Sequence, residues 1–478
     1  MAQNTPAAVD SIDINQEINL EQAIQIALAN NTQLKQAVLS IDEADQQIRT
    51  AWSQVMPDIA LSADYTRNLE VPVNFLPEIV FDPNGDPDAL IPVAFGTDNN
   101  WSGGLAISQT LFSGQAFVGI SSADLYKTAQ SESLRATSQG VVTQTRLTYY
   151  QVLLAKEQLR LIEAQIERIN SNLDDTRKRA EQGFADDYAV LQLEVQQSNL
   201  EPQRTSAEFA IDNAVRELLD VMGLPVHLTI GVTGNLNSFD IHSTTASSEE
   251  NEALKTIDRL TQTQVESDPL FTQDVLEYRG DIRVLDIQKQ LQEKQLSAQR
   301  SNYLPTLSAN YNLNWSASQA GRPVFFGTEQ TRARSQTILL NLRFPIFQGF
   351  SRDAAVQTAK IEMKDLEVQE YQTQQTATKE ILATQQSILE AYETSEARNK
   401  ALEQAEIGYD RALARYQSGV GTQQEVTDAD LQLREAENNY AQMVLNYLSA
   451  KAEYDQAIGQ VPYIGQNTES INNNIELN

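Results

Sequence analysis

The stretch RYQSGVGTQQEVTDAD, Arg415–Asp430, decides the fold of this chain. It carries a turn with Gly419 and Gly421 between two long periodic segments. After the turn, apolar or small residues recur at alternating steps of three and four, at positions 426, 429, 433, 436, 440, 443, 447, 450, 454 and 457. That spacing is a heptad pattern with its a and d positions filled. A seven-residue column also precedes the turn: Ile388, Leu402, Tyr409 and Tyr416. The stretch therefore predicts two long helices joined by a tight hairpin.

The same pattern stands once more in the first half of the chain. A turn at Gly183 follows a seven-residue column made of Val152, Leu159, Ile166, Leu173 and Ala180. Every member of this pattern precedes its counterpart in the second half by about 236 positions, with a period far longer than that of a solenoid. The sequence therefore indicates an internal duplication of one large unit.

Each half also contains two segments with the period-two alternation of a β-strand. In the first half they are Ile59–Thr66 and Trp101–Leu111, and in the second Leu307–Ser316 and the segment 338–344. The segment 69–97 between the first pair is rich in proline and aspartate, and we interpret it as a long loop. We therefore expect one β-hairpin in each half, at about 58–112 and at about 306–346.

These patterns divide the chain into five parts. Residues 1–17 are predicted to be a flexible N-terminus, and residues 462–478 a disordered C-terminal tail. Residues 18–225 form repeat 1, with a helical tip at about 181–188, and residues 269–461 form repeat 2, with a tip at about 417–424. Residues 226–268 link the two repeats. The longest predicted helix in each repeat would measure roughly 100 Å at 1.5 Å per residue.

Composition excludes several classes of protein. The chain has 478 residues with 35 basic and 65 acidic side chains, and a net charge of −30 argues against nucleic-acid binding. It contains no cysteine and only two histidines, and it shows no Gly-x-Ser-x-Gly or phosphate-binding motif, so we predict no enzyme, no cofactor and no metal site. We also expect that a signal peptide has been removed ahead of Ala2-Gln3.

The two hairpins have an apolar face and a face of small polar residues, which is the pattern of a transmembrane β-sheet. Four strands cannot close a barrel, and an open edge is not tolerated in lipid. The hairpins of several copies must therefore assemble. Two copies would give eight strands with a filled interior and three would give twelve strands with a pore, and we predict the trimer.

Several motifs of the chain resemble the TolC family of outer-membrane efflux and secretion channels. They are the opening LEQAIQIALANN, the helix-to-strand junctions WSQVMPDIALSADY and RSNYLPTLSANYN, the segments SQTLFSG and RFPIFQG, and the two glycine-containing tips. The resemblance covers Leu20 to about Pro462. It implies a mixed α and β membrane protein, a homotrimer with a 12-stranded β-barrel (four strands per chain) in the outer membrane of a Gram-negative-type bacterium and a long α-helical barrel in the periplasm.

The resemblance also implies a function. The chain would be the exit duct of a tripartite efflux pump or a type I secretion system, with a periplasmic adaptor protein and an inner-membrane pump of the RND or ABC type as partners. The alternative is a soluble trimeric coiled-coil rod or adhesin without a pore. A rod has no use for two aromatic-bearing amphipathic hairpins, which favours the duct. The exported substrate, the adaptor and the pump stay open.

In this family, acidic residues at the positions of Glu425 and Asp428 face the lumen and form a cation-binding constriction. The alternative is local, because Thr422-x-x-Glu425 is also a capping box and acids in a first turn complement the helix dipole. Capping does not explain Asp428. Tyr416 matches the tyrosine that ties the second tip to the first, although it is equally well a residue of the heptad core.

The tip departs from the pattern of the family's best-known member, which has an arginine in place of Gly421 and an aspartate in place of Ala189. We expect a different interlock, using Asp186, Asp187 or Arg415, and whether the tip is closed at rest stays open. The resemblance assigns adaptor docking to the two tip turns, namely Gly183, Phe184, Gly419, Val420, Gly421 and Thr422.

Two further features belong to the hairpins. We expect four aromatic side chains to face the membrane: Tyr65, Trp101, Tyr311 and Trp315. The segment Asp82–Asp88 is similar to a calcium-binding loop, but a proline replaces the required glycine and Val93 stands where the bidentate acid belongs. We interpret this segment as an extracellular turn, with calcium binding as the alternative.

Overall fold

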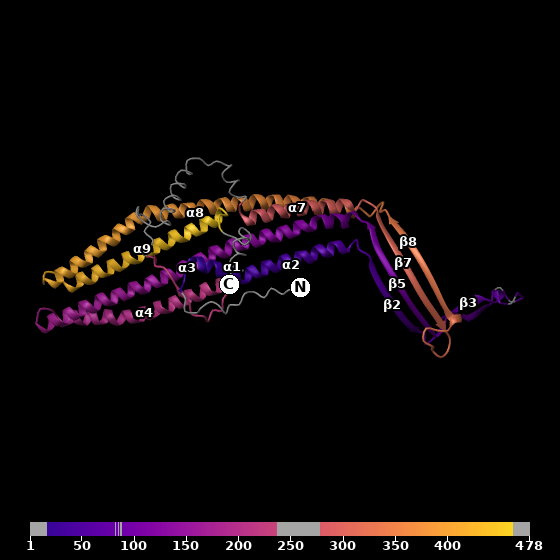
Figure 1. Ribbon diagram of the computed structural model, residues 1–478, viewed down its shortest axis with the longest axis horizontal. Helices are drawn as coiled ribbons and strands as arrows, with labels where there is room; N and C mark the ends of the chain where they lie inside the picture. The colour runs from indigo at the N-terminus through magenta and orange to yellow at the C-terminus, as the bar shows by residue number, and fades with distance from the viewer. Residues whose placement is uncertain (1–16, 82, 85, 87, 237–277, 462–478) are drawn as a thin grey trace, which may run out of the picture. The chain divides into compact units, whose positions relative to one another are not determined.

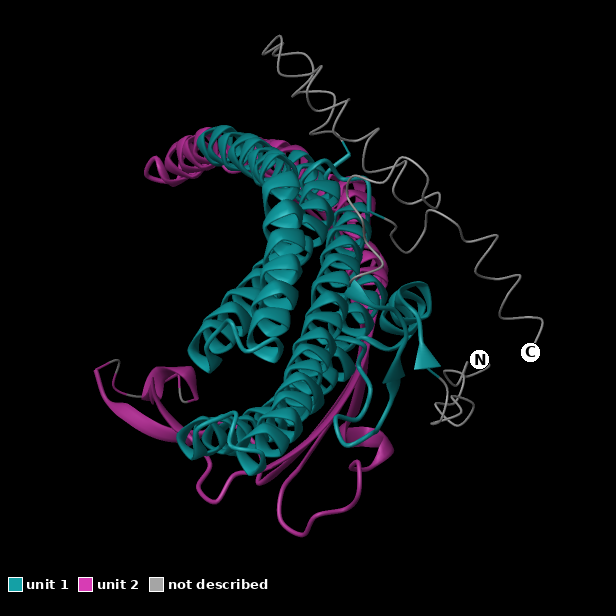
Figure 2. Ribbon diagram, turned by 90° about the vertical axis from the view of Figure 1, so that its left-hand side faces the viewer, with its two compact units in different colours: residues 1–42, 128–288, 367–478 teal, residues 43–127, 289–366 magenta. Residues whose placement is uncertain are grey.

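The computed structural model describes residues 17–81, 83–84, 86, 88–236 and 278–461. The predicted N-terminal segment up to residue 16, most of the linker and the C-terminal tail lie outside the described residues. The described chain forms two compact units (Figure 2). Unit 1 takes in residues 1–42, 128–288 and 367–478, and unit 2 takes in residues 43–127 and 289–366.

Two helical hairpins of nearly equal size lie mostly in unit 1, and their long helices begin in unit 2, with residues 114–127 and 351–366 (Figure 1). In the first, α3 (Gly114–Glu181) is followed by α4 (Asp187–Val221), and in the second, α8 (Ser351–Gln417) is followed by α9 (Gln423–Ala457). The long helices have 68 and 67 residues, and each returning helix has 35. The heptad pattern therefore indicates the helices on both sides of each turn. Pro202 lies inside α4, which continues through it.

The described residues also form three shorter α-helices: α1 (Leu20–Asn30), α2 (Thr32–Ser53) and α7 (Gly280–Ser301). Asn19 caps α1 in a reciprocal capping box with Gln22. α2 and α7 both have 22 residues and both lead into a strand. Among the described residues, no helix is long and apolar enough to cross a membrane.

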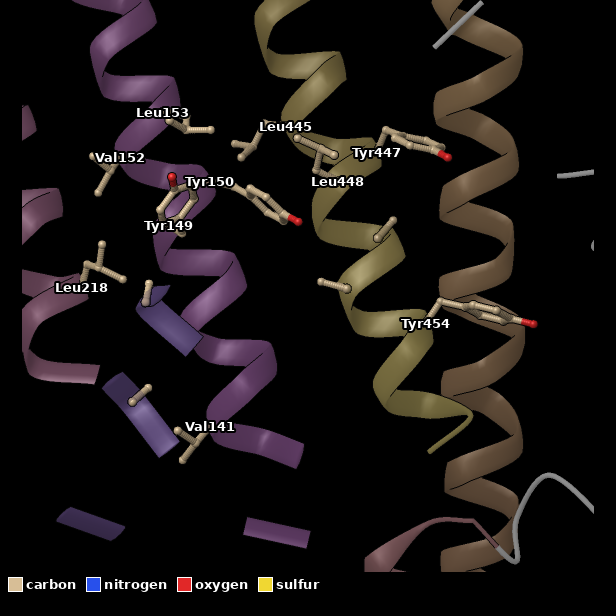
Figure 3. Close-up of a cluster of buried hydrophobic side chains, with 14 of the residues drawn as sticks. Val141, Tyr149, Tyr150, Val152, Leu153, Leu218, Leu445, Tyr447, Leu448 and Tyr454 are labelled. Carbon is tan, nitrogen blue, oxygen red and sulfur yellow. The ribbon is translucent and has the colours of Figure 1, made fainter. Parts of the chain in front are cut away.

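The largest apolar core of unit 1 lies where α3 and α9 face each other (Figure 3). Tyr150 and Leu153 on α3 point toward Leu445 and Leu448 on α9, and Leu218 joins them from α4. These four side chains of α3 and α9 lie outside the predicted heptad positions, which supply other members of the same core, such as Val152 and Tyr447. A short parallel pair of strands, β1 (Glu17–Ile18) and β6 (Gly231–Val232), lies beside α3, where Lys156 donates to the Val232 carbonyl at 2.7 Å.

Each half also forms a joint between the end of a returning helix and the start of a shorter helix. Asn31 donates through Nδ2 to the Val221 carbonyl at 2.7 Å, and its Oδ1 accepts from the backbone of Gln33 at the start of α2. In the second half, Arg279 donates to the Ala457 carbonyl at 3.3 Å. Both side chains satisfy a carbonyl that the helix end leaves without an intrahelical partner.

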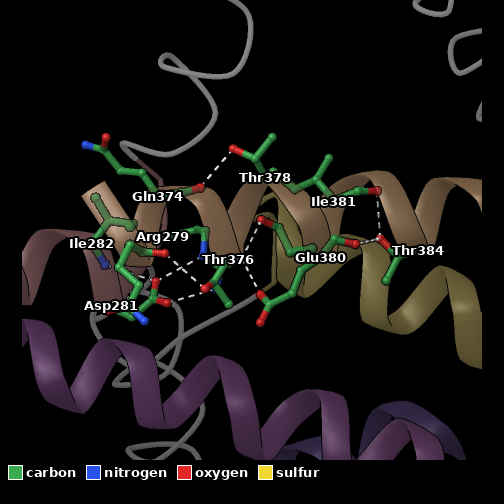
Figure 4. Close-up of polar contacts among 11 residues, drawn as sticks. Arg279, Asp281, Ile282, Gln374, Thr376, Thr378, Glu380, Ile381 and Thr384 are labelled. Carbon is green, nitrogen blue, oxygen red and sulfur yellow. Dashed lines mark hydrogen bonds and ion pairs between the residues drawn. The ribbon is translucent and has the colours of Figure 1, made fainter. Parts of the chain in front are cut away.

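The Arg279 joint is charged (Figure 4). The guanidinium binds Asp281 at 2.8 Å and Glu380 of α8 at 2.9 Å, and its side chain is 12% exposed. Burial alone would raise the pKa of the Asp281 carboxyl, but the hydrogen bonds and charge of Arg279 outweigh burial and lower it. The joint therefore holds its carboxylate ionised.

Unit 2 contains one four-stranded antiparallel sheet with the order β2-β5-β7-β8. The strands are β2 (Asp58–Arg67), β5 (Asn99–Phe112), β7 (Thr306–Gln319) and β8 (Arg332–Arg343). All four lie where the alternation predicts strands. The two hairpins join through β5 and β7, whose register runs from Asn99 opposite Gln319 to Phe112 opposite Leu307. Among the described strands, β2 and β8 each lack a neighbour on one side.

One face of this sheet is apolar over most of its length. Directly opposed residues share a face. One cross-strand row is made of Ile59, Ile107, Tyr311 and Ile338, and the next is made of Leu61, Leu105 and Leu313 and ends at Gln336 on β8. Farther along, Trp315 is opposite Arg334, whose guanidinium lies 5.9 Å from the indole centroid. The apolar band therefore ends near Trp315.

The interpretation of residues 69–97 as a loop was wrong in part. The segment contains a two-stranded ribbon of β3 (Val73–Pro77) and β4 (Leu90–Ala94), with a 3-10 turn at Glu78–Val80. Proline at Pro77 and Pro92 weakens the strand pattern, because proline cannot donate to a ladder. In unit 2 the ribbon forms a sheet of its own, separate from the four-stranded sheet (Figure 1).

Candidate functional site

The two tip turns have the same backbone geometry. In the first, the Phe184 amide donates to the Arg179 carbonyl and Gly183 donates to Ala180, and in the second, Val420 donates to Arg415 and Gly419 to Tyr416. This pair of bonds is the Schellman motif, which needs a residue with positive φ. Gly183 and Gly419 supply it at φ of 76° and 77°.

Each turn exposes one large apolar side chain at its end. Phe184 is 80% exposed and Val420 is 73% exposed, although the Schellman motif often packs this position against the helix. Gly421, the residue after Val420, packs closely against Arg415: a Cβ at Gly421 would lie 3.1 Å from the Arg415 Cβ. The arginine of the related family member could not enter this turn without moving it.

The residues that open the returning helices cap them. Asp186 accepts a hydrogen bond from the Tyr188 amide at 3.1 Å, and the Thr422 hydroxyl accepts from the Glu425 amide at 3.3 Å. Thr422 is thus the N-cap of α9, which is one half of the predicted capping box, while the Glu425 carboxylate lies near Arg415. Asp186 therefore caps its own helix, and a part for it in the interlock stays a prediction.

Glu425 and Asp428 lie on one exposed face of the first turns of α9. Glu425 Oε2 is 3.7 Å from Arg415 Nε, and Asp428 Oδ1 accepts from Gln424 Nε2 at 2.8 Å. Neither carboxylate is buried by its own chain. Both are free to meet other groups, and their role as a gate stays a prediction.

Tyr416 does tie the second tip to the first. Its ring is buried in a cluster with Tyr409, Val426 and Leu433, and its hydroxyl lies 3.1 Å from the Thr176 hydroxyl of α3. Tyr416 is therefore both a core residue and a polar link, which combines the two readings of the sequence.

The interlock uses a residue that the sequence analysis missed. Arg179 of α3 donates to the carbonyls of Tyr416 at 2.9 Å and of Gln417, and its guanidinium lies 5.5 Å from the Tyr416 ring centroid. Gln417 in turn donates to Asp175 at 3.2 Å. Arg179 stands in the last turn of its helix, where a cation also complements the helix dipole. The sequence signal that could have indicated this contact was a basic residue in the last turn of the helix before the first tip.

A second missed cluster lies farther from the turns. Arg168 of α3 donates to Asp430 of α9 at 3.0 Å and to Glu437 at 3.4 Å, and Gln165 donates to Asp430 at 2.8 Å. The acid side chains are 13% and 14% exposed. Burial raises the pKa of the Glu437 carboxyl above its ordinary value, although Arg168 acts in the opposite direction.

The aromatic residues predicted to face the membrane differ in exposure. Tyr65 is 49% exposed, whereas Trp101 is 7% exposed and stacks on Tyr65 with centroids 5.0 Å apart. The Phe326 ring lies near Gly103, two residues from Trp101 on the same face. Tyr311 and Trp315 are partly exposed. The chain itself therefore covers most of Trp101, which the alternation does not predict.

For the calcium alternative, residues 82, 85 and 87 lie outside the described residues. Asp86 accepts from the Asp88 amide at 2.9 Å, which is a local turn bond. In the part of the chain that the structure describes, no three His, Cys, Asp or Glu side chains are placed to hold a metal ion.

Comparison with known proteins now adds to this geometry. The family model described as outer membrane efflux protein matches residues 23–224 and 271–460. The chain belongs to the outer membrane efflux protein family. Members of the outer membrane efflux protein family are channels, so the chain is an outer-membrane exit duct with its helices in the periplasm.

Relatives and solved structures agree with the family. The outer membrane protein TolC of Salmonella enteritidis is 23% identical over 452 residues, which cover 93% of this chain and 83% of the relative. Among solved structures, CusC superposes with a TM-score of 0.70 at 19% identity and covers 92% of both chains. The CmeC outer membrane channel of Campylobacter jejuni gives a TM-score of 0.70 at 18% identity, over 96% of this chain and 88% of that one. Both structures show that this efflux family's fold extends over nearly the whole chain.

Proposed function

We propose that three copies of this chain close one duct, which carries small molecules or proteins out of the periplasm and itself catalyses no reaction. The observation that supports this is the sheet order β2-β5-β7-β8, which leaves two edge strands to pair with other copies. Three copies supply twelve strands, enough to enclose an open pore. A trimeric mass for the protein in mild detergent is expected. A monomeric mass in a sample that still inserts into bilayers would overturn the proposal.

We further propose that Glu425 and Asp428 form a cation-selective gate. Both carboxylates are exposed at the tip of one chain, and three chains bring six of them around one axis. Clustered like charges attract counter-ions. The Tyr416 and Arg179 contacts are proposed to hold the gate by linking the second hairpin to the first.

Single-channel recording with a divalent cation on the periplasmic side tests the gate. The divalent cation should block the double variant Glu425→Gln, Asp428→Asn at least several-fold less readily. The variant should also lose its preference for cations. Asp212→Asn, an exposed acid of α4 away from the tip, is the control and should leave both properties unchanged. An unchanged block in the double variant would mean that the two acids serve only their own helix.

The two tip turns are proposed to dock a periplasmic adaptor, which connects the duct to an inner-membrane pump of the RND or ABC type. Phe184 and Val420 support this, because each is a large apolar side chain held outward by a rigid turn. Replacing both with serine should weaken co-purification with the adaptor about 10-fold or more, with the trimer intact. Equal recovery of the adaptor would refute docking at these turns.

The partly exposed aromatic residues Tyr65, Tyr311 and Trp315 are proposed to lie in the membrane band, with Trp101 beside them under a cover of its own chain. Brominated-lipid quenching of single-tryptophan variants tests this proposal. Trp315 fluorescence should be quenched more strongly than that of Trp52, which lies in the last turn of α2. Equal quenching would contradict the assignment.

A further inference from the structure

The β3–β4 ribbon has one face that is entirely apolar. The cross-strand pairs Val73–Ala94, Phe75–Pro92 and Pro77–Leu90 share this face. Phe75 is 63% exposed and Leu90 is 60% exposed. A two-stranded ribbon is at best marginally stable in water. A contact that covered this apolar face would therefore stabilise the ribbon.

A second apolar group stands at the same end of the strands, in the turn between β7 and β8. Phe325 is 86% exposed, and Val324 beside it is 46% exposed. The next residue, Phe326, has a φ of 56°, which is an unfavourable conformation for a bulky residue. Arg332 donates to the Phe326 carbonyl at 2.7 Å and to the Gly327 carbonyl at 3.2 Å and so holds this backbone. Strain that is held in place in this way is typical of functional positions.

Within one chain these two groups do not cover each other, since Phe75 and Phe325 are both exposed in the same compact unit. Their segments nevertheless carry opposite charge. Residues 68–98 contain six acidic side chains and no basic one, whereas residues 320–334 contain three arginines and one glutamate. Arg322 is among the exposed arginines. Opposite charge favours contact between the two segments and disfavours contact between two ribbons.

The order of the sheet decides which copies meet. The ribbon follows β2, one free edge, and the turn with Phe325 precedes β8, the other free edge. When β8 of one copy pairs with β2 of the next, the basic turn of the first copy comes beside the acidic ribbon of the second. We propose that Phe325 docks on the apolar face of the neighbouring copy's ribbon and fastens adjacent copies together outside the membrane. This inference rests on the proposed trimer.

Disulfide trapping tests this contact cleanly, because the chain has no cysteine of its own. Two differently tagged chains, one with Phe75→Cys and the other with Phe325→Cys, would be co-expressed and oxidised in mild detergent. We expect a covalent dimer of the two tags in most of the mixed trimers. A chain with both substitutions should give covalent trimers. The pair Leu90→Cys and Val324→Cys is the second test of the same contact.

The control replaces Phe325→Cys with Phe347→Cys. Phe347 is 71% exposed but follows β8, at the opposite end of the strands, and should give no covalent dimer with Phe75→Cys. A disulfide within one chain, seen by mass spectrometry in the doubly substituted chain, would overturn the inference in favour of a ribbon covered by its own chain.

Two other results also overturn it. If neither pair cross-links while the protein keeps its trimeric mass, the docking contact is wrong and the trimer stands; loss of the trimeric mass in unsubstituted protein refutes the trimer itself. If a bimane label at Phe75→Cys is quenched by brominated lipid, the ribbon lies in the membrane instead of on the neighbouring copy.

Discussion

In the first half of the chain, Asn31 donates to the carbonyl of Val221, and in the second half Arg279 donates to the carbonyl of Ala457. The backbone around the two contacts is the same. Gly223 and Gly459 have φ values of 71° and 70°, and each lies against the backbone at the start of the next helix. The comparison teaches that the two halves keep one backbone joint and fill it with different side-chain chemistry.

The largest expected effect comes from the backbone that the halves share. A Cβ on Gly223 would lie 2.4 Å from the Asn30 carbonyl oxygen, and one on Gly459 would lie 2.6 Å from the Tyr278 carbonyl. Gly223→Ala and Gly459→Ala should therefore each lower the unfolding free energy by about 2–4 kcal/mol. Thermal unfolding in detergent measures this loss. Gly408→Ala, in α8 with no atom within 4 Å of its Cβ position, should be neutral or stabilising. Unequal losses of unfolding free energy in Gly223→Ala and Gly459→Ala would contradict the conclusion that the two joints share one backbone geometry.

The side chains of the joint should differ in effect. Arg279→Ala removes a guanidinium that is 12% exposed, together with its charge-assisted bonds to Asp281 and Glu380, and should cost about 2–3 kcal/mol of unfolding free energy. Asn31→Ala removes neutral hydrogen bonds and should cost about 1–2 kcal/mol. Urea unfolding of the two variants decides between them. If Asn31→Ala costs as much as Arg279→Ala, the charged network adds nothing to the joint.

A third difference concerns acids at matching positions of the returning helices. Asp430 is 13% exposed and bonded to Arg168, whereas its counterpart Glu194 is 42% exposed and bonded to Arg177. Asp430→Asn should lower the unfolding free energy by about 1–2 kcal/mol, since it weakens a charge-assisted bond in a buried place. Glu194→Gln should cost less than about 0.5 kcal/mol. The same urea measurements apply, and equal losses would show that burial of the pair is unimportant.

The smallest expected effects are in pH dependence, and their signs are opposite. The raised pKa of Glu437 means that its contribution to stability is full below the unfolded pKa and is lost as pH rises through the folded pKa. The lowered pKa of Asp281 means that its contribution is present above the unfolded pKa and is lost as pH falls through the folded pKa. Glu437→Gln should flatten the loss of stability as pH rises through the pKa of Glu437. Asp281→Asn should flatten the loss of stability as pH falls through the pKa of Asp281. Melting temperatures over roughly pH 3–8 measure both. The same slope in a variant and the unsubstituted protein would contradict the assignment of that group.

The sequence predicts the parts of this molecule that depend on local periodicity. The heptads around Gly183 and Gly419 locate the long helices, and period-two alternation locates the four strands of the sheet. The division into five parts stays a prediction, because the compact units cut across the repeats. The ribbon within residues 69–97 was missed, since Pro77 and Pro92 interrupt its alternation.

The candidate site was predicted only where it is local. The Thr422 cap could be predicted because it involves only the four consecutive residues from Thr422 to Glu425. The Arg179 contact with Tyr416 joins residues 237 positions apart, so its existence depends on how the two hairpins pack. The same holds for Arg168 and Asp430, and for the cover that Phe326 gives the surface near Trp101.

The pairing of β5 with β7 has a consequence for the order of folding. Each helical hairpin and each β-hairpin is closed by contacts within its own half, but Asn99 pairs with Gln319, which lies 220 positions later. Contacts of such large sequence separation form slowly, because loop closure precedes any gain. Until then β5 and β7 each present an unpaired edge beside an apolar face, which is the form of a sheet most prone to aggregation. A chain whose sheet is not yet complete therefore passes through a stage with two separate hairpins, each with an exposed apolar face and an unpaired edge.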